Sequence, residues 1–285
     1  MHREDWDAVY LNQDKILNSL NGLKSNIFLA GGTGLHRFVL RKPYRYSEDL
    51  DFFFPHLVKN KEMLAAVNEV TDRISSLPGV NIDEVRYLKE ERAFRLWCSF
   101  KENDEIVKIE FLNFTCDRFG KDTFITKNVP FKTENLYNLL LYKVKALCDR
   151  PDTIKDLFDL YFIFQNLSAI SIEQVLEDIN AKFVDAIGIR YEKSNILQSL
   201  QHDLKWDIEI GEIEYFYDLQ IEINTFWVQL KETIENEEIF DFSYQKRIEK
   251  RSKIFNLDIS SYLELIDVLE ENNFWVNEIK SLKYM

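Results

Sequence analysis

The sequence has few of the residues that mark fibrous, disulfide-stapled or membrane proteins. Its 285 residues include only Gly 8, Pro 5 and Cys 3, which excludes collagen-like and low-complexity chains. The cysteines lack CxxC spacing, so they favour neither a disulfide framework nor a cysteine zinc site. No apolar run approaches the ~20 residues of a bilayer span, and residues 1–5 do not resemble a signal peptide. We therefore expect a cytoplasmic protein without a membrane partner.

Negative charge is abundant but confined to one half of the chain. Residues 1–170 contain 24 Lys+Arg and 25 Asp+Glu, a net charge of −1. Residues 171–285 contain 12 and 24, a net charge of −12. A strongly acidic surface disfavours non-specific binding of nucleic acid. The near-neutral first half is therefore where we expect anions to be handled.

The hydrophobic pattern changes near residue 130. Strand-like runs at 27–30, 50–54, 80–88, 93–100 and 106–114 alternate with helical patterns at 33–40 and 61–77. Longer helical patterns follow at 134–148, 153–166 and 172–186. At ~150 residues per domain, this indicates an α/β (α+β) core over 1–130 and an all-helical domain over 131–285.

A glycine-rich turn joins the first expected strand to a helix. Gly31 and Gly32 leave the main-chain N–H groups and the helix N-terminus open to a phosphate chain, and the Thr33 hydroxyl adds a donor. The spacing matches neither GxxxxGK[ST] nor GxGxxG, so P-loop and dinucleotide-binding sites are excluded. We expect an anion cradle here, and Arg45, further along the chain, could hold a triphosphate or an RNA backbone.

Asp49 and Asp51 flank Leu50 on an expected strand, so both carboxylates emerge on one face. Oxygen ligands of this kind suit Mg²⁺ (or Mn²⁺), and two such ions can clamp the oxygens of a phosphoryl transfer. Glu110, a lone acid within the apolar strand 106–112, is the candidate third ligand, because a charge there is costly without a cation. Alternatively, Glu110 forms a salt bridge with Lys108 or an arginine.

Two helices carry further charged residues on apolar faces. Lys143 falls on the apolar stripe of 134–148, where it either extends its amine to solvent or reaches an anion such as a nucleotide phosphate. Asp156 and Asp159 are i, i+3 neighbours on the next helix and point the same way. They could also be first-turn acids favoured by the helix dipole.

Several of these segments together resemble a known family. They are Gly31-Gly32-Thr33, Arg45 to Phe53 (RYSEDLDFF), Lys108-Ile109-Glu110, Lys143 to Arg150 (KVKALCDR) and Lys155 to Leu160 (KDLFDL). The combination resembles the AbiEii/AbiGii toxin family of nucleotidyltransferase-like proteins, of the type IV toxin–antitoxin kind. The resemblance spans roughly residues 25–170.

The resemblance implies a fold, a reaction and partners. The fold would be a core of the DNA polymerase-β type with a small mixed sheet, followed by helices of which the first two contribute to the active site. The reaction would be Mg²⁺-dependent transfer of NMP from an NTP to an acceptor such as the tRNA 3′ end, and a cognate antitoxin would be a partner. By motif, Asp49 and Asp51 would bind metal, Lys143 would contact the nucleotide and Asp156 would be a further acid of the site.

Two other functions fit the same residues. One is a nucleotidyltransferase acting on a small molecule, with the same core and metals. The other is a catalytically inactive binding module whose acidic helical half docks a basic partner. The basic run at 246–253 could touch RNA, although a solvated helix face is the better explanation.

Overall fold

The computed structural model describes residues 3–40, 45–103, 105–113, 131–150, 153–167, 169–201, 216–236 and 240–241. The boundary expected near residue 130 and the basic run at 246–253 lie outside these ranges. No helix in the described part of the chain combines the length and apolar character needed to cross a bilayer.

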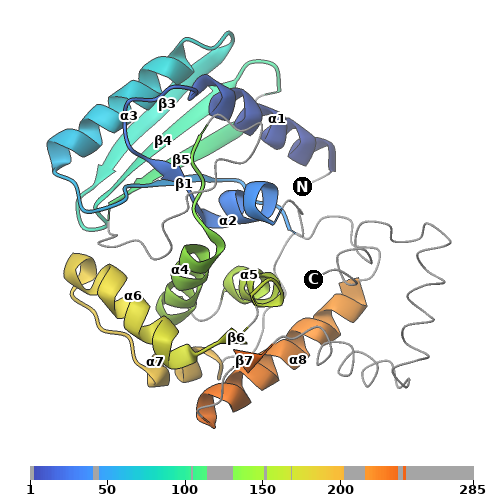
Figure 1. Cartoon of the computed structure of the whole chain (residues 1–285). Coiled ribbons are helices and arrows are strands. Elements are labelled where there is room, and N and C mark those ends of the chain that lie inside the picture. The colour runs from blue at the N-terminus through green and yellow to red at the C-terminus, as the bar shows by residue number, and fades with distance from the viewer. Residues whose placement is uncertain are drawn as a thin grey trace.

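A five-stranded mixed sheet forms the core of the first part (Figure 1). Its strands are β1 (Phe28–Leu29), β2 (Leu50–Phe53), β3 (Val80–Leu88), β4 (Ala93–Phe100) and β5 (Ile106–Leu112). The spatial order is β1-β2-β5-β4-β3, in which β2 and β5 are parallel and the other neighbours are antiparallel. This confirms the predicted α/β core, and the observed bounds of β3 and β4 are those expected from the apolar alternation.

Two helices cover one face of this sheet (Figure 1). They are α1 (Arg3–Ser19) and α3 (Asn60–Ser75), whose apolar side chains pack with those of β2, β4 and β5. The apolar pattern at 61–77 predicts α3, whereas no helix is predicted over α1, which contains the polar residues Asn12 and Gln13. Both are fully buried in the structure.

The Gly-Gly segment begins a short helical passage between β1 and β2. It comprises α2 (Gly31–Thr33) and a π-helical turn, η1 (Gly34–Val39). Together these account for the helix expected at 33–40. The main-chain N–H of Gly34 donates to the carbonyl of Ala30, at 3.0 Å, so the helical turn starts directly at the end of the strand.

Within the described residues of the second part, the chain is helical, as predicted, except for one two-stranded ladder. Its elements are α4 (Leu136–Asp149), α5 (Ile154–Gln165), β6 (Ala169–Ile170), α6 (Ile172–Ile187), α7 (Lys193–Ser199), α8 (Phe216–Glu235) and β7 (Phe240–Asp241). The strands β6 and β7 pair antiparallel with each other, an element that the helical periodicity does not predict.

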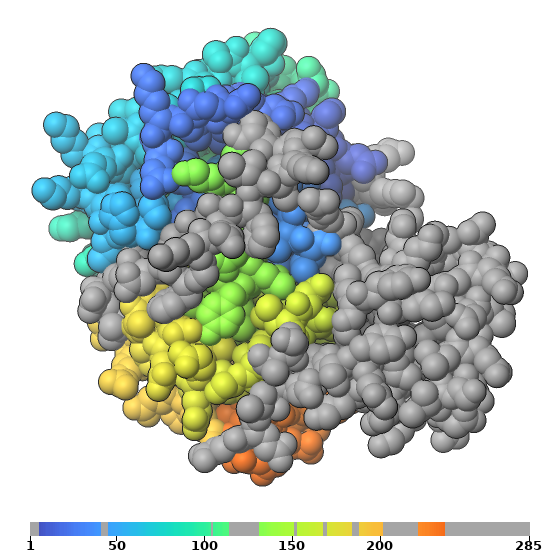
Figure 2. Space-filling model, viewed as in Figure 1, coloured from blue at the N-terminus to red at the C-terminus, as the bar shows by residue number. Residues whose placement is uncertain are grey.

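The two parts share a hydrophobic core. Phe28 and Phe53, from the edge of the sheet, pack in one cluster with Leu139 of α4 and Phe158 of α5. Figure 2 shows the blue atoms of the first part in contact with the green atoms of the second on this face. The end of the sheet that carries β1 and β2 is therefore held directly against α4 and α5.

Candidate functional site

Three carboxylates meet where β2 and β5 run side by side. Asp49 precedes β2, Asp51 lies within it, and Leu50 between them is buried in the core. Asp51 is in register with Glu110 of β5. One carboxylate oxygen from each of the three lies within 4.8 Å of the others, and no other such group of potential metal ligands occurs among the described residues. The structure thus brings together the three acids proposed from the sequence.

Two basic side chains contact these acids. Lys108 lies two residues before Glu110 on the same strand, and its Nζ is 2.7 Å from Oδ2 of Asp49 and 3.7 Å from Oε1 of Glu110. Arg95 of β4, in register with Glu110, donates from Nε to the Glu110 carboxylate. Glu110 therefore takes part in salt bridges and in the acidic group at the same time, and the two interpretations of this residue are compatible.

Asp51 and Asp49 are destabilised as anions when no bound cation balances them. Burial, and then the charges of Asp49 and Glu110, raise the pKa of Asp51 to about 7. Burial also raises the pKa of Asp49, although Lys108 opposes the change. A divalent cation would relieve this repulsion, and the set of oxygen ligands fits Mg²⁺ or Mn²⁺. The residues present therefore fit the metal that the sequence predicts.

The two glycines of the turn permit close approach to the site. Gly31 has φ +63, and a Cβ there would lie 1.9 Å from Oδ2 of Asp51. A Cβ on Gly32 would lie 2.6 Å from Nη2 of Arg45. Any side chain at either position would displace a charged residue, and a positive φ itself favours glycine. The side chains of Asp51 and Arg45 thus require glycine at these two positions of the turn.

Thr33 lies beneath the acids and is fully buried. Its Oγ1 donates to the carbonyl oxygen of Asp49, at 2.6 Å. The Thr33 hydroxyl was expected to contact a phosphate. In this structure it instead donates its proton to the main chain of Asp49, a proposed metal ligand.

A buried ionic cluster, made of His36, Arg45, Lys143, Asp156 and Asp159, lies next to the acids. Asp159 of α5 is its centre: its oxygens accept from Nε of Arg45 at 2.8 Å and from Nη2 at 2.7 Å, and Nζ of Lys143 is 2.6 Å away. Nε2 of His36 is also 2.7 Å from this carboxylate. Asp159 therefore connects the turn, the segment before β2, and α4.

The electrostatics of this cluster follow from its burial. Burial alone would raise the pKa of Asp159, but the positive groups around it, Arg45 first, hold that pKa well below its usual range. Burial lowers the pKa of His36, so the imidazole stays neutral in spite of its acidic neighbour. Asp159 is accordingly charged, and Arg45 and Lys143 are its counter-ions.

Lys143 neither extends to solvent nor stands free for a nucleotide. Its side chain is 8% exposed, and its Nζ is 3.0 Å from Oδ1 of Asp156 as well as close to Asp159. Arg150 donates from Nε to Oδ2 of the same Asp156, at 2.7 Å. The anions that Lys143 reaches in this structure are carboxylates of α5. Its positive charge also opposes, in part, the rise in the pKa of the nearby Asp51.

Sequence reasoning missed some of these relationships. The sequence indicates Asp159 only as a neighbour of Asp156, and it gives no signal for a role of His36. The i, i+2 spacing of Lys108 and Glu110 was the available signal for a lysine on the same face. The contact of Arg45 with Asp159 had no such signal, because it joins elements far apart in sequence.

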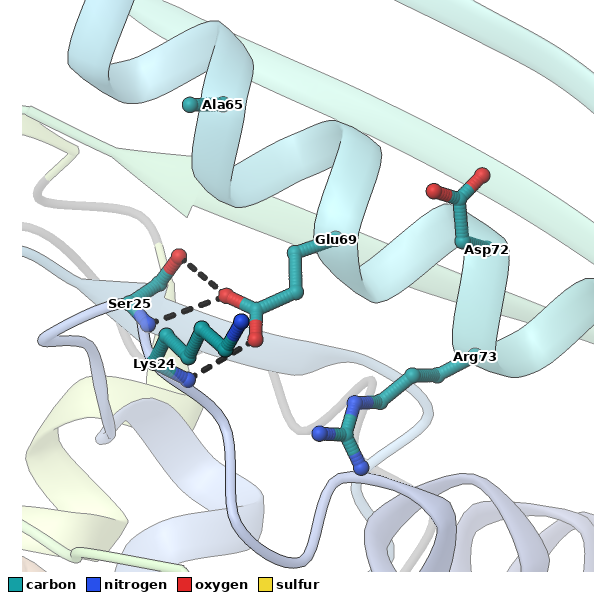
Figure 3. Close-up of a pocket in the computed structure, with 6 residues that line it drawn as sticks. All are labelled: Lys24, Ser25, Ala65, Glu69, Asp72 and Arg73. Carbon is teal, nitrogen blue, oxygen red and sulfur yellow. Dashed lines mark hydrogen bonds between the residues drawn. The ribbon is translucent and has the colours of Figure 1, made fainter.

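A separate hollow of about 560 Å³ lies between α3 and the loop after α1 (Figure 3). Its polar groups serve the fold: the Glu69 carboxylate accepts from the main-chain N–H groups of Lys24 and Ser25, at 2.8 and 2.9 Å. Arg73 donates to main-chain carbonyls of the same loop, including that of Asn21. These contacts hold the loop after α1 against α3.

The sequence and the fold were compared with known proteins. The family model described as "Nucleotidyl transferase AbiEii toxin, Type IV TA system" matches residues 15–227. Comparison with curated proteins gave no match. The crystal structure of JHP933 from Helicobacter pylori is similar in fold, with 17% identity, a TM-score of 0.51, and coverage of 83% of this chain and 96% of that chain.

A second solved structure is MenT4, a nucleotidyltransferase toxin from Mycobacterium tuberculosis H37Rv. It has 16% identity and a TM-score of 0.49, and the match covers 82% of this chain and 92% of that chain. The family match extends over most of the chain, including the turn, the three acids, α4 and α5. The chain belongs to the AbiEii family of nucleotidyltransferase toxins.

Proposed function

We propose that this protein transfers NMP from an NTP to an acceptor hydroxyl in a Mg²⁺-dependent reaction. The observation that carries the proposal is the meeting of three carboxylates beside a Gly-Gly turn. Asp49, Asp51 and Glu110 would hold the metal, and the turn at Gly31 and Gly32 would receive the triphosphate. When bound, Mg²⁺ would neutralise the phosphate charge and orient the reacting oxygens.

The chain's own residues supply positioning and charge. The acceptor oxygen forms a bond to the α-phosphorus, the α–β phosphoanhydride bond breaks, and pyrophosphate leaves. Glu110 receives the proton of the acceptor hydroxyl. Lys143, whose amine is paired with Asp156 and Asp159, places a positive charge near Asp51 and would offset phosphate charge from that position once the nucleotide is bound.

The cluster beside the acids supports this arrangement. Asp156 would act through Lys143 and Arg150, whose positions it sets by salt bridges. The guanidinium of Arg45 lies beside Gly32 and forms a salt bridge with Asp159. Arg45 would therefore stabilise the conformation of the Gly31-Gly32 turn when the triphosphate binds there. These roles assign the predicted site residues to ligands of the metal, contacts of the nucleotide and supports of both.

We extend the proposal to an acceptor and to a protein partner. We propose the tRNA 3′ end as the acceptor, because a terminal hydroxyl is the nucleophile that the reaction needs. A cognate antitoxin would be the protein partner, as the family's type IV toxin–antitoxin description implies.

The test is nucleotidyl transfer by the purified protein. Mg²⁺, each α-³²P-labelled NTP and total tRNA are incubated with the wild type and with the Asp49→Ala/Asp51→Ala variant. Asp72→Ala, an exposed acid on α3, is the matched control. Labelled RNA should form with the wild type and the control, and not with the double variant.

The alternatives give different results. Label on a small molecule in place of RNA would support a nucleotidyltransferase with another acceptor. Absence of transfer with every NTP, together with a partner complex insensitive to the double substitution, would support the binding module and overturn the proposal.

A further inference from the structure

The segment 45–49 leads into β2 and ends at Asp49; we call it the acidic strap. It lies outside the strands of the sheet, so its main-chain groups need partners elsewhere. The carbonyls of Ser47 and Glu48 immediately precede the first proposed metal ligand. Whatever holds these carbonyls also sets the position of the Asp49 carboxylate.

A single side chain of α1 holds both carbonyls. Gln13 is fully buried, and its Nε2 donates to the carbonyl oxygens of Ser47 and Glu48, each at 2.9 Å. Its Oε1 accepts from Nη1 of Arg37 on η1, at 2.8 Å. All the hydrogen-bonding capacity shown for this amide is thus directed at the strap and at the helical turn that follows the two glycines.

Other side chains of α1 reinforce the contact. The hydroxyl of Tyr10 accepts from the main-chain N–H of Ser47, at 3.3 Å. The rings of Trp6 and Tyr46 stack with centroids 4.3 Å apart and an interplanar angle of 6°. Because Thr33 holds Asp49 from within the turn, the strap is held from two elements at once.

These α1 residues precede the part of the chain that the family describes. The family match begins at residue 15, whereas Gln13, Tyr10 and Trp6 lie before it. The strap and the acids lie within the match. These three side chains therefore contact the site from a part of the chain that the family match does not cover.

We propose that Gln13 is a positioning residue that sets the Asp49 carboxylate for cation binding. The inference rests on the proposed function in that Asp49 is taken as a metal ligand. Groups that hold a metal ligand in place commonly change metal affinity by about 10- to 100-fold when removed. Gln13 would act in this way through the two carbonyls that precede Asp49.

The test uses Gln13→Glu in the full chain. The variant keeps the shape of the side chain and an acceptor for Arg37, but loses the two N–H donors to the strap. The added negative charge of glutamate would by itself strengthen cation binding. Weaker binding by the variant would therefore show that the Asp49 carboxylate is no longer held in position. Gln13→Met, which loses the donors without adding charge, is the second variant.

Asn12→Asp is the matched control. Asn12 is the neighbouring residue of α1 and is also fully buried, but its Nδ2 donates to Oδ1 of Asn103, in the loop between β4 and β5, at 3.0 Å. Asn12→Asp replaces a buried amide with an acid, as Gln13→Glu does. It leaves the strap untouched.

Two measurements separate the possible failures. The first is binding of Mn²⁺ alone, by calorimetry; the second is hydrogen–deuterium exchange of peptides covering residues 45–53. For both Gln13 variants we expect about tenfold weaker Mn²⁺ binding, in line with a lost support of a metal ligand. We also expect faster exchange confined to the strap, with neither effect in Asn12→Asp.

Unchanged Mn²⁺ affinity and unchanged strap exchange in the folded Gln13 variants would overturn the inference, as would equal effects in Asn12→Asp. If the wild type bound no Mn²⁺, the metal-dependent function would fail, and the positioning of a metal ligand would fail with it. The exchange data would still show whether Gln13 holds the strap. The two failures are therefore distinguishable.

Discussion

Asp51 and Glu110 are paired residues of the parallel strands β2 and β5. Parallel neighbours at this register place two acidic side chains on the same face of the sheet, and Asp49 joins them from the start of β2. Burial of Asp51, and then its proximity to the charges of Asp49 and Glu110, disfavour its ionised form, and the pKa of Asp51 is raised as a result.

Asp51 should make the metal-free protein less stable as the pH rises. Its ordinary pKa is 3.8 and its pKa in the folded chain is about 7, so between these values the folded state retains a proton that the unfolded state has lost. The free energy of unfolding therefore falls with rising pH across this window and levels off above about 7. In Asp51→Asn this contribution is absent.

Thermal unfolding in EDTA from pH 4 to pH 8 measures the difference. We expect the wild type to lose stability relative to Asp51→Asn as the pH rises, so that the variant is the more stable of the two at pH 8. Mn²⁺ should reverse the order by stabilising only the wild type. Parallel pH profiles of the two proteins would contradict the assignment.

Gly31→Ala should disable the site, whereas Gly22→Ala should not. Both glycines have a positive φ, so both alanines pay a backbone cost of about 1–2 kcal/mol. Only at Gly31 would the new Cβ collide with Asp51; at Gly22 no atom lies within 4 Å. We expect nucleotidyl transfer to fall at least about 100-fold in Gly31→Ala, as misplacement of reacting groups does. Equal activities of the two variants would refute the close-approach argument.

Asp159→Asn should destabilise the whole chain. It leaves the buried Arg45 and Lys143 short of a counter-charge, and breaking a buried pair costs about 3–5 kcal/mol. Asp14→Asn breaks the more exposed pair with Arg37 and should cost less than about 1 kcal/mol. Urea denaturation of both variants measures the free energies of unfolding. A cost for Asp159→Asn no larger than that for Asp14→Asn would show that the cluster is not a structural support.

Lys108→Met should tighten metal binding. The lysine amine lies 2.7 Å from Asp49 and competes with any cation for that carboxylate. Above pH 8, where Asp51 is ionised, we expect Mn²⁺ to bind several-fold more tightly to the variant, measured by calorimetry. Lys15→Met, which removes a surface partner of Glu102, is the control and should leave the affinity unchanged. Weaker Mn²⁺ binding would instead make Lys108 a support of the metal ligands.

The local pattern of the chain predicted the elements that carry the site. Alternation through Leu96 and Cys98 predicted β4, and the apolar residues around Asp51 predicted β2 with both acids on one face. Glu110 was recognised because a lone charge in an apolar strand needs a partner. These inferences succeed because strand periodicity and the cost of burying a charge are properties of a few neighbouring residues.

Long-range partners could not be predicted in the same way. Whether Lys143 meets a phosphate or Asp159 depends on how α4 packs against α5, and the role of Gln13 depends on where α1 lies against the strap.

The sequence by itself determined the mixed α/β core, the helices α4, α5 and α6, the family and the three acids, because each follows from local spacing or from a motif. The tertiary structure alone decided the register of β2 against β5 and the salt bridge between Arg45 and Asp159. It also placed the Asp51 carboxylate where a side chain on residue 31 would collide with it, so that this position requires glycine. Those features arise when segments distant in the chain are packed together and must satisfy each other's charges and hydrogen bonds.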